Sequence, residues 1–145
     1  MMKYISAEQF NQADKKVQDR IMEWYKKNVE IGDLVSHPKG IAYPYLLQDE
    51  TFVLDFINGY MGIVVPLLTT QQLVDYIKWR TGYGIEEIKF GAGDCYWVEP
   101  YFESDYSMDQ ETPRWYYKEM SFCDEELIKA LWKCACEVAT DDYYN

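Results

Sequence analysis

The side chains that could perform nucleophilic or metal chemistry are few, and their spacing suits neither role. The 145 residues include four cysteines and one histidine, namely Cys95, Cys123, Cys134, Cys136 and His37. Structural zinc sites use paired ligands such as C-x2-C, with a second pair at a set distance. Cys134 and Cys136 form the one close pair, and on the helix expected there they point about 200° away from each other. We therefore expect free thiols, no metal site and no cofactor.

Motifs of catalytic or phosphate-binding loops are missing as well. His37 precedes a proline in an expected turn, and no G-x-S-x-G nucleophile elbow accompanies it. The glycines near positions 82–84 and 91–93 lack the spacing of a Walker loop or a dinucleotide fingerprint, and turn chemistry explains them better. Among the 25 acidic residues no spacing indicates two carboxylates opposed across a cleft. The sequence thus predicts no catalytic residue and a protein that is not an enzyme.

One constellation of residues remains, and it is acidic and aromatic. From Asp94 to Glu126 the chain carries ten carboxylates interleaved with aromatic side chains. On strands, alternation would bury one set of side chains and display the other on a single face. A displayed row of carboxylates resembles the charge of a phosphate backbone, as in a DNA mimic, and aromatic residues are preferred anchors at interfaces. The expected partner-binding residues are Glu99, Tyr101, Glu103, Asp105, Tyr106, Asp109 and Glu111.

The net charge of −11 is unevenly distributed along the chain. Residues 1–93 hold 12 acidic and 10 basic side chains, whereas residues 94–145 hold 13 acidic and 4 basic ones. This excess argues against direct nucleic-acid binding, because affinity for that backbone comes from lysine and arginine displacing counterions. A basic partner, by contrast, would be attracted and steered. A surface that only keeps the protein soluble accounts for the same charge and stays an alternative.

Length and composition bound the fold class and the location. A chain of 145 residues with 48% apolar and 17% aromatic side chains fits one folded domain, 1–145. The longest nearly apolar run, 59–68, has half of the about 20 residues that a membrane-spanning helix needs. The N-terminus shows no long apolar segment or cleavage site of a signal peptide. We therefore expect a cytoplasmic protein without membrane contact.

Two helices are expected near the N-terminus. Ser6 and Gln9 have the spacing of a capping box, which predicts a short helix to about residue 12. Asp14 is the candidate cap of a second helix that ends near residue 28. Its apolar face is expected in the core, with Val17, Ile21, Trp24 and Tyr25.

Two further helices are expected in the centre and at the end of the chain. Thr69 begins the central one in a second capping box, and Gly82 ends it with a left-handed cap. Ser121 or Asp124 begins the last one, whose first turn then holds carboxylates that suit the positive end of the helix dipole. The core side chains expected from these helices are Leu73, Ile77, Leu127, Leu131 and Trp132. The same apolar faces also hold Val74, Tyr76, Trp79, Ile128, Ala135, Val138 and Ala139.

The segments between the helices favour strands. Short apolar or alternating runs predict strands at 31–35, 41–47, 62–68, 85–90, 95–102 and 114–122, with turns at 36–40 and 91–94. Segment 52–57 fits a strand or a helical turn equally, and 103–113 is expected to form a mobile acidic loop. This order predicts an α+β fold with a largely antiparallel sheet packed against N-terminal, central and C-terminal helices.

Positions spread over most of the chain carry a resemblance to a known group of proteins. They are Lys3-Tyr4-Ile5-Ser6, Phe10, Val17-Gln18, Trp24, Ile31-Gly32-Asp33-Leu34, Pro66-Leu67-Leu68-Thr69, Gln72-Leu73, Leu127 and Ala130-Leu131-Trp132. In them the sequence resembles small uncharacterised proteins encoded by phages and prophages of clostridia and related Firmicutes, although 103–113 does not match. The resemblance implies expression in a host cytoplasm. Small acidic phage proteins often inhibit host defence, anti-CRISPR proteins among them, and many occupy a basic nucleic-acid channel.

Three functions remain open. The first is an acidic inhibitor that occupies the basic groove of a host defence complex, its partner being a basic host protein or ribonucleoprotein. The second is a sponge for a nucleotide defence signal, which is weakened by the scarcity of cations in residues 94–145. The third is a non-enzymatic phage structural or regulatory protein. A homodimer through exposed aromatic residues would favour the second or the third.

Overall fold

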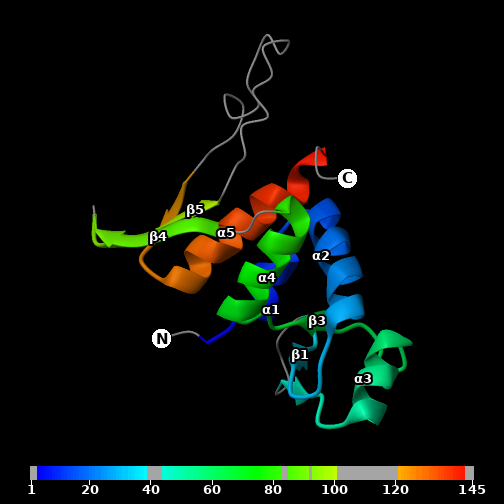
Figure 1. The fold of residues 1–145 in the computed structure, drawn as a ribbon. Helices are drawn as coiled ribbons and strands as arrows, with labels where there is room; N and C mark the ends of the chain where they lie inside the picture. Colours follow the sequence, from blue (N-terminus) through cyan, green and yellow to red (C-terminus); the bar gives the residue numbers. More distant parts are fainter. Residues whose placement is uncertain (1–2, 39–43, 83–84, 92, 101–120, 143–145) are drawn as a thin grey trace. The chain divides into compact units, whose positions relative to one another are not determined.

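The computed structural model describes residues 3–38, 44–82, 85–91, 93–100 and 121–142. These residues include five helices and six strands (Figure 1). The helices are α1 (Ala7–Gln12), α2 (Lys15–Asn28), α3 (Glu50–Ile57), α4 (Thr70–Thr81) and α5 (Leu127–Thr140). The strands are β1 (Leu34–Ser36), β2 (Tyr45–Leu46), β3 (Val65–Pro66), β4 (Ile85–Gly91), β5 (Cys95–Pro100) and β6 (Phe122–Asp124). They form two antiparallel sheets, ordered β2-β1-β3 and β4-β5-β6. The predicted α+β class is confirmed.

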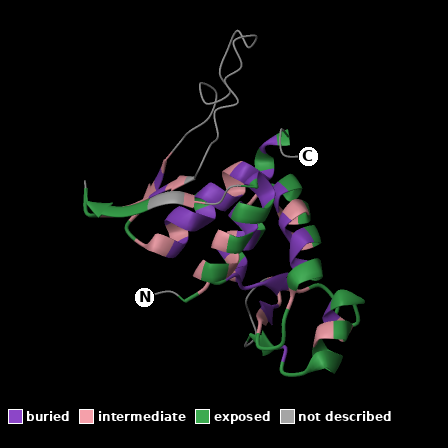
Figure 2. Ribbon diagram, viewed as in Figure 1, coloured by how far each residue is buried: buried purple, intermediate pink, exposed green. Residues whose placement is uncertain are grey.

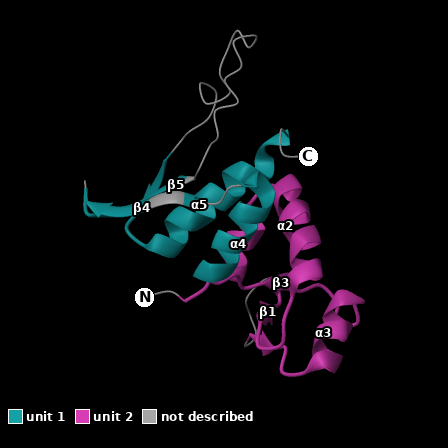
Figure 3. Cartoon of the chain, in the orientation of Figure 1, with its two compact units in different colours: residues 1–2, 70–145 teal, residues 3–69 magenta. Residues whose placement is uncertain are grey.

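The chain divides into two compact units (Figure 3). Unit 1 comprises residues 1–2 and 70–145, and therefore α4, the β4-β5-β6 sheet and α5. Unit 2 comprises residues 3–69, with α1, α2, α3 and the β2-β1-β3 sheet. The expectation that 1–145 forms one domain stays a prediction. None of the helices in the described ranges is both long and apolar enough to cross a membrane.

Unit 2 begins with the predicted capping box. The Gln9 N–H donates to Ser6 Oγ at 3.1 Å, and the Ser6 N–H donates to Gln9 Oε1 at 2.9 Å. These bonds satisfy two amide groups that the start of a helix leaves without acceptors. Asp14 is the N-cap of α2, as predicted, but its side chain makes no capping bond. The predicted face of α2 is buried, with Val17, Ile21, Trp24 and Tyr25.

Tyr25 connects three parts of unit 2. Its ring meets the Phe56 ring of α3 edge-on, with centroids 5.4 Å apart. Its hydroxyl donates to Asp33 Oδ2 at 3.3 Å, and the same carboxylate oxygen accepts the Glu30 N–H at 3.0 Å. Burial, followed by the Asp33 carboxylate, holds the pKa of Tyr25 well above its ordinary value. The hydroxyl therefore stays protonated and serves as a donor that ties α2 to the turn before β1.

Two strand predictions for unit 2 were too long. The strand expected over 31–35 begins only at Leu34, because Gly32, with a φ of 99°, turns the chain. The strand expected over 62–68 consists of Val65–Pro66, and Ile63 is 81% exposed instead of buried.

The neighbouring segments also differ from expectation. Ser36 is a buried member of β1 and not part of a turn. Within the strand expected over 41–47, residues 41–43 lie outside the described part and β2 holds Tyr45–Leu46. The ambiguous segment 52–57 belongs to α3.

In unit 1, α4 buries most of its predicted face. Leu73, Tyr76 and Ile77 are fully buried, and Val74 is half-buried. Trp79 was expected on this face but is 55% exposed, with its ring tilted beside that of Tyr76. The predicted C-cap is confirmed in Gly82, whose φ is 85° and whose N–H donates to the Lys78 carbonyl at 2.8 Å.

The last helix starts later than predicted. Its N-cap is Glu126, whereas Asp124 ends β6 and accepts the Glu126 N–H at 3.1 Å, and Ser121 precedes β6. The carboxylates expected in the first turn therefore lie just before the helix, and Leu127 at its start is half-buried instead of core. The rest of the predicted stripe is buried (Figure 2), with Ile128, Leu131, Trp132, Ala135, Val138 and Ala139.

Arg80 of α4 holds the end of α5. Its Nε donates to the Val138 carbonyl at 3.0 Å, and its Nη2 donates to the carbonyls of Asp141 at 2.8 Å and Ala139 at 3.5 Å. The guanidinium is buried, with 9% of the residue exposed. The last carbonyls of a helix have no partner within the helix and form the negative end of its dipole. The buried Arg80 side chain donates hydrogen bonds to these carbonyls and places a positive charge at the negative end of the dipole.

We expect Leu131→Ala to lower the free energy of unfolding by about 2–5 kcal/mol, because it empties volume in a fully buried position. Denaturant unfolding followed by circular dichroism measures this. Leu54→Ala is the matched control, since Leu54 is 49% exposed and should lose less than about 0.5 kcal/mol. A similar loss in both variants would show that α5 does not pack as described.

Replacing Arg80 by Gln should cost about 2–4 kcal/mol of unfolding free energy, because three buried carbonyls lose a charged donor. Arg80→Lys should recover part of this loss at most, since a point charge cannot reproduce the forked geometry. Lys78→Gln, at an exposed position of the same helix, is the control. Equal unfolding midpoints for the variants at positions 78 and 80 would contradict the assigned role.

Candidate functional site

One of the seven predicted partner-binding residues lies in the part of the chain that the structure describes. Glu99 lies in β5 and is half-buried. The other six, Tyr101, Glu103, Asp105, Tyr106, Asp109 and Glu111, lie outside the described residues, as do the acidic loop expected over 103–113 and most of the strand expected over 114–122. The candidate site is therefore built from Glu99 and its neighbours in the β4-β5-β6 sheet.

The sheet has one face under α5 and one face turned away from it. Val98, in the middle of β5, is fully buried and pairs with Ile88 of β4 and Phe122 of β6. Helix α5 packs against β5 and β6. Because successive side chains of a strand point to opposite faces, Trp97 and Glu99 project from the face opposite Val98. An aromatic ring and a carboxylate therefore share one face of β5, and both side chains are half-buried, as is that of Tyr96.

Glu99 is engaged by a lysine of the neighbouring strand. Lys89 Nζ lies 3.2 Å from Glu99 Oε1, and the two side chains are 52% and 32% exposed. In the strand register Lys89 stands opposite Trp97, so its reach to Glu99 is diagonal. An ion pair this exposed contributes about 0–1 kcal/mol. A cation brought by a partner can therefore replace Lys89 at little cost.

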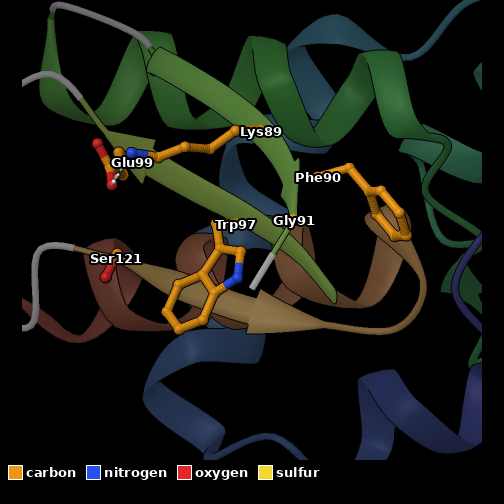
Figure 4. A pocket seen from close by; sticks show the side chains of 6 residues that line it. All are labelled: Lys89, Phe90, Gly91, Trp97, Glu99 and Ser121. Atoms are coloured by element: carbon orange, nitrogen blue, oxygen red, sulfur yellow. Dashed lines mark ion pairs between the residues drawn. The ribbon is translucent and has the colours of Figure 1, made fainter. Parts of the chain in front are cut away.

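A hollow of about 270 Å³ opens on this face of the sheet. It is lined by Lys89, Phe90, Gly91, Trp97, Glu99 and Ser121 (Figure 4). Figure 4 shows Lys89 and Glu99 reaching toward one another, while Phe90 extends away from them. Small-molecule pockets usually enclose about 300–1,000 Å³. The hollow is thus smaller than a usual ligand pocket, and its size suits one or two side chains of a partner protein.

Two other carboxylates of unit 1 are paired with lysines of α5. Lys133 Nζ lies 3.1 Å from Asp124 Oδ2, and Lys129 Nζ lies 3.0 Å from Glu126 Oε2. Burial opposes ionisation of Asp124, but the Glu126 N–H and Lys133 outweigh it, and the pKa of this carboxyl is lowered. The sequence analysis placed these side chains in one displayed acidic row, whereas in the structure each is paired with a lysine near the start of α5.

Two cysteines of unit 1 have a raised pKa, which disfavours the reactive thiolate. Burial, followed by the neighbouring Cys136 and Glu137, raises the pKa of Cys134 to about 12. Desolvation, then Cys123 and nearby carboxylates, raises the pKa of Cys95 as well. All four cysteines are free, and within the described ranges no three His, Cys, Asp or Glu side chains gather as metal ligands.

Lys89, Trp97 and Ser121 are site residues that were not among the predicted contacts. Trp97 belonged to the aromatic set, and its spacing of two from Glu99 was a signal that both share a face. The alternation over 85–90 placed Lys89 on a strand, but the register that brings it to Glu99 is not encoded in either strand alone.

Comparison of the chain with protein-family models, curated proteins and solved structures finds no match.

The raised thiol pKa values predict a pattern of alkylation. At pH 8 the folded protein should leave Cys134 unmodified by iodoacetamide, because the thiolate is the nucleophile and a pKa of about 12 leaves almost none of it. Cys95 should react more slowly than a cysteine in a short peptide, and the difference should shrink as the pH rises. Peptide-level mass spectrometry measures both rates.

In urea all four thiols should react alike, which provides the internal control. Rapid modification of Cys134 in the folded protein would mean that α5 is not buried as the structure has it.

Proposed function

We propose that the protein is an acidic binding protein that inhibits a bacterial host defence complex by occupying a basic, nucleic-acid-binding groove of that complex. The carrying observation is the charge of residues 94–145, which hold 13 acidic and 4 basic side chains. The resemblance to phage and prophage proteins supports the setting, a host cytoplasm. The partner is a basic protein or ribonucleoprotein, and no catalytic step is required.

The open face of the β4-β5-β6 sheet supplies the chemistry for such a contact. A guanidinium seated on this face can stack on the Trp97 ring and pair with Glu99 in place of Lys89. Arginine forms such planar, two-bonded contacts better than lysine, so it gains more from Glu99 than the resident Lys89 does. The hollow thus favours a partner rich in arginine.

The acidic segment is joined to this face at both of its ends. Glu99 and Ser121 line the same hollow, and residues 101–120 lie between them in the sequence. That interval contains five carboxylates and two basic residues, Arg114 and Lys118. A groove that binds DNA faces one charge per about 1.7 Å of helix axis and so carries closely spaced cations. Carboxylates delivered from one anchored face suit such a groove.

The hollow also bears on the alternative of a nucleotide sponge. Its aromatic wall, Trp97, would stack on a base, and Lys89 is a cation beside it. Yet Lys89 is paired with Glu99, whose charge repels a phosphate at the same place. A volume of about 270 Å³ is also small for a nucleotide. The geometry therefore favours a protein side chain over an anionic ligand.

Charge reversal tests the proposal. A variant with Glu103→Lys, Asp105→Lys, Asp109→Lys and Glu111→Lys should capture its partner from lysate of a bacterial host at least about tenfold less well, because like charges then meet in the groove. Glu99→Lys alone should weaken capture less. Affinity purification with quantitative mass spectrometry identifies the partner, and added duplex DNA should release it from the wild-type protein.

A matched control carries the same change in net charge elsewhere. Glu8→Lys, Asp19→Lys, Glu23→Lys and Glu30→Lys alter exposed positions of unit 2. This control should retain the partner, whereas a general loss of negative charge would affect both variants equally. Unchanged capture and salt dependence in the first variant would show that the acidic segment only keeps the protein soluble.

A further inference from the structure

Exposed apolar side chains are concentrated in one stretch of unit 2. Of the eleven large apolar residues that are exposed in the described ranges, eight fall between positions 31 and 63. They are Ile31, Tyr45, Leu46, Phe52, Leu54, Ile57, Tyr60 and Ile63. Single exposed apolar residues are ordinary, whereas a contiguous patch of them marks an interaction surface. Figure 2 shows α3 and the turn after it as largely exposed.

Helix α3 is apolar over a wider arc than unit 2 covers. Phe56 is buried against Tyr25 and fixes the inward side of the helix. Leu54 and Ile57 are 49% and 37% exposed, and residues three apart stand side by side on a helix surface. They form a ridge of the kind that packs against a second helix.

The turn after α3 has a defined conformation and carries two more exposed apolar side chains. Gly59 has a φ of 78°, its N–H donates to the Phe56 carbonyl at 3.1 Å, and the Tyr60 N–H donates to the Asp55 carbonyl at 2.8 Å. This bond pair is a Schellman motif, which ends a helix with defined geometry. Tyr60 and Ile63 are 78% and 81% exposed just beyond it. Leu54, Ile57, Tyr60 and Ile63 are named the α3 face below.

The charge around the α3 face is acidic. Asp49 and Glu50 at the start of α3 are exposed, and Asp55 within it is half-buried. From position 30 to position 63 the sequence holds five carboxylates and a single lysine, Lys39. An apolar centre with an acidic rim is complementary to an apolar surface with a basic rim. A second copy of this chain would place like charges against each other.

We propose that the α3 face binds a basic amphipathic helix of a partner protein, with leucine-type side chains against the ridge and lysine or arginine beside Glu50 and Asp55. Helices of this kind bind by laying their apolar face on a complementary apolar surface, with anchors three and four positions apart. This contact lies in unit 2 and does not depend on the acidic segment at 101–120.

Fluorescence anisotropy with a defined probe tests the contact. The probe is a labelled 18-residue peptide of leucine and lysine, with leucine at helical spacing. A scrambled peptide of the same composition should bind at least about tenfold more weakly, because charge alone is not sufficient. In the protein, Leu54→Gln with Ile57→Gln should reduce binding of the helical probe by about tenfold or more. Glutamine keeps the helix propensity of α3.

Two further variants keep the result interpretable. Trp79→Gln with Ile88→Gln removes exposed apolar side chains from unit 1 and should leave probe binding unchanged. Glu50→Gln with Asp55→Gln should weaken binding and its salt dependence without touching the ridge. Equal binding of the scrambled peptide, or full binding by the variant at positions 54 and 57, would overturn the proposal. So would a dimer, seen by analytical ultracentrifugation, that the same two substitutions dissociate.

Discussion

The three hydrogen bonds from Arg80 to the end of α5 are the constraint on which unit 1 depends. Helix α5 packs against β5 and β6. The contacts that hold α5 in place against α4 therefore also hold the helix on which the sheet packs. A guanidinium can bond several carbonyls at once because its donors form a rigid fork. Taking that charge out of water is costly, and only the full set of acceptors offsets the cost. Arg80 therefore selects one position of α4 against α5.

Four of the five described helices, α3 excepted, could be predicted from sequence because their signals are local. The capping box of Ser6 and Gln9, the glycine cap at Gly82 and the apolar stripe around Leu131 each depend on residues within a few turns. Strands depend on distant partners, so 62–68 shrank to two residues and Phe52 turned out helical. Nothing in the sequence marked Arg80, since its partners lie about 60 residues away and are main-chain atoms.

The candidate site shows the same division between local and distant information. Period-two alternation was sufficient to place Trp97 and Glu99 on one face of a strand. That Lys89 would reach Glu99 depends on the pairing register of β4 with β5, which a count of charges does not contain. The cluster of carboxylates near Asp124 looked uniform in sequence, yet lysines of α5 pair with two of its members.

Some of the acidic residues in 94–145 are paired with lysines in the folded protein. Glu99, Glu126 and Asp124 are paired with Lys89, Lys129 and Lys133, so three carboxylates of the described sheet and α5 are engaged locally. Residues 101–120 hold five acidic and two basic residues, a net charge of −3, and the rest of 94–145 holds eight acidic and two basic residues, a net charge of −6. Like charges spread over one third of a chain repel each other, which opposes a compact state. A basic groove would remove that repulsion on binding, so the excess that is unfavourable in the free protein becomes a driving force for association.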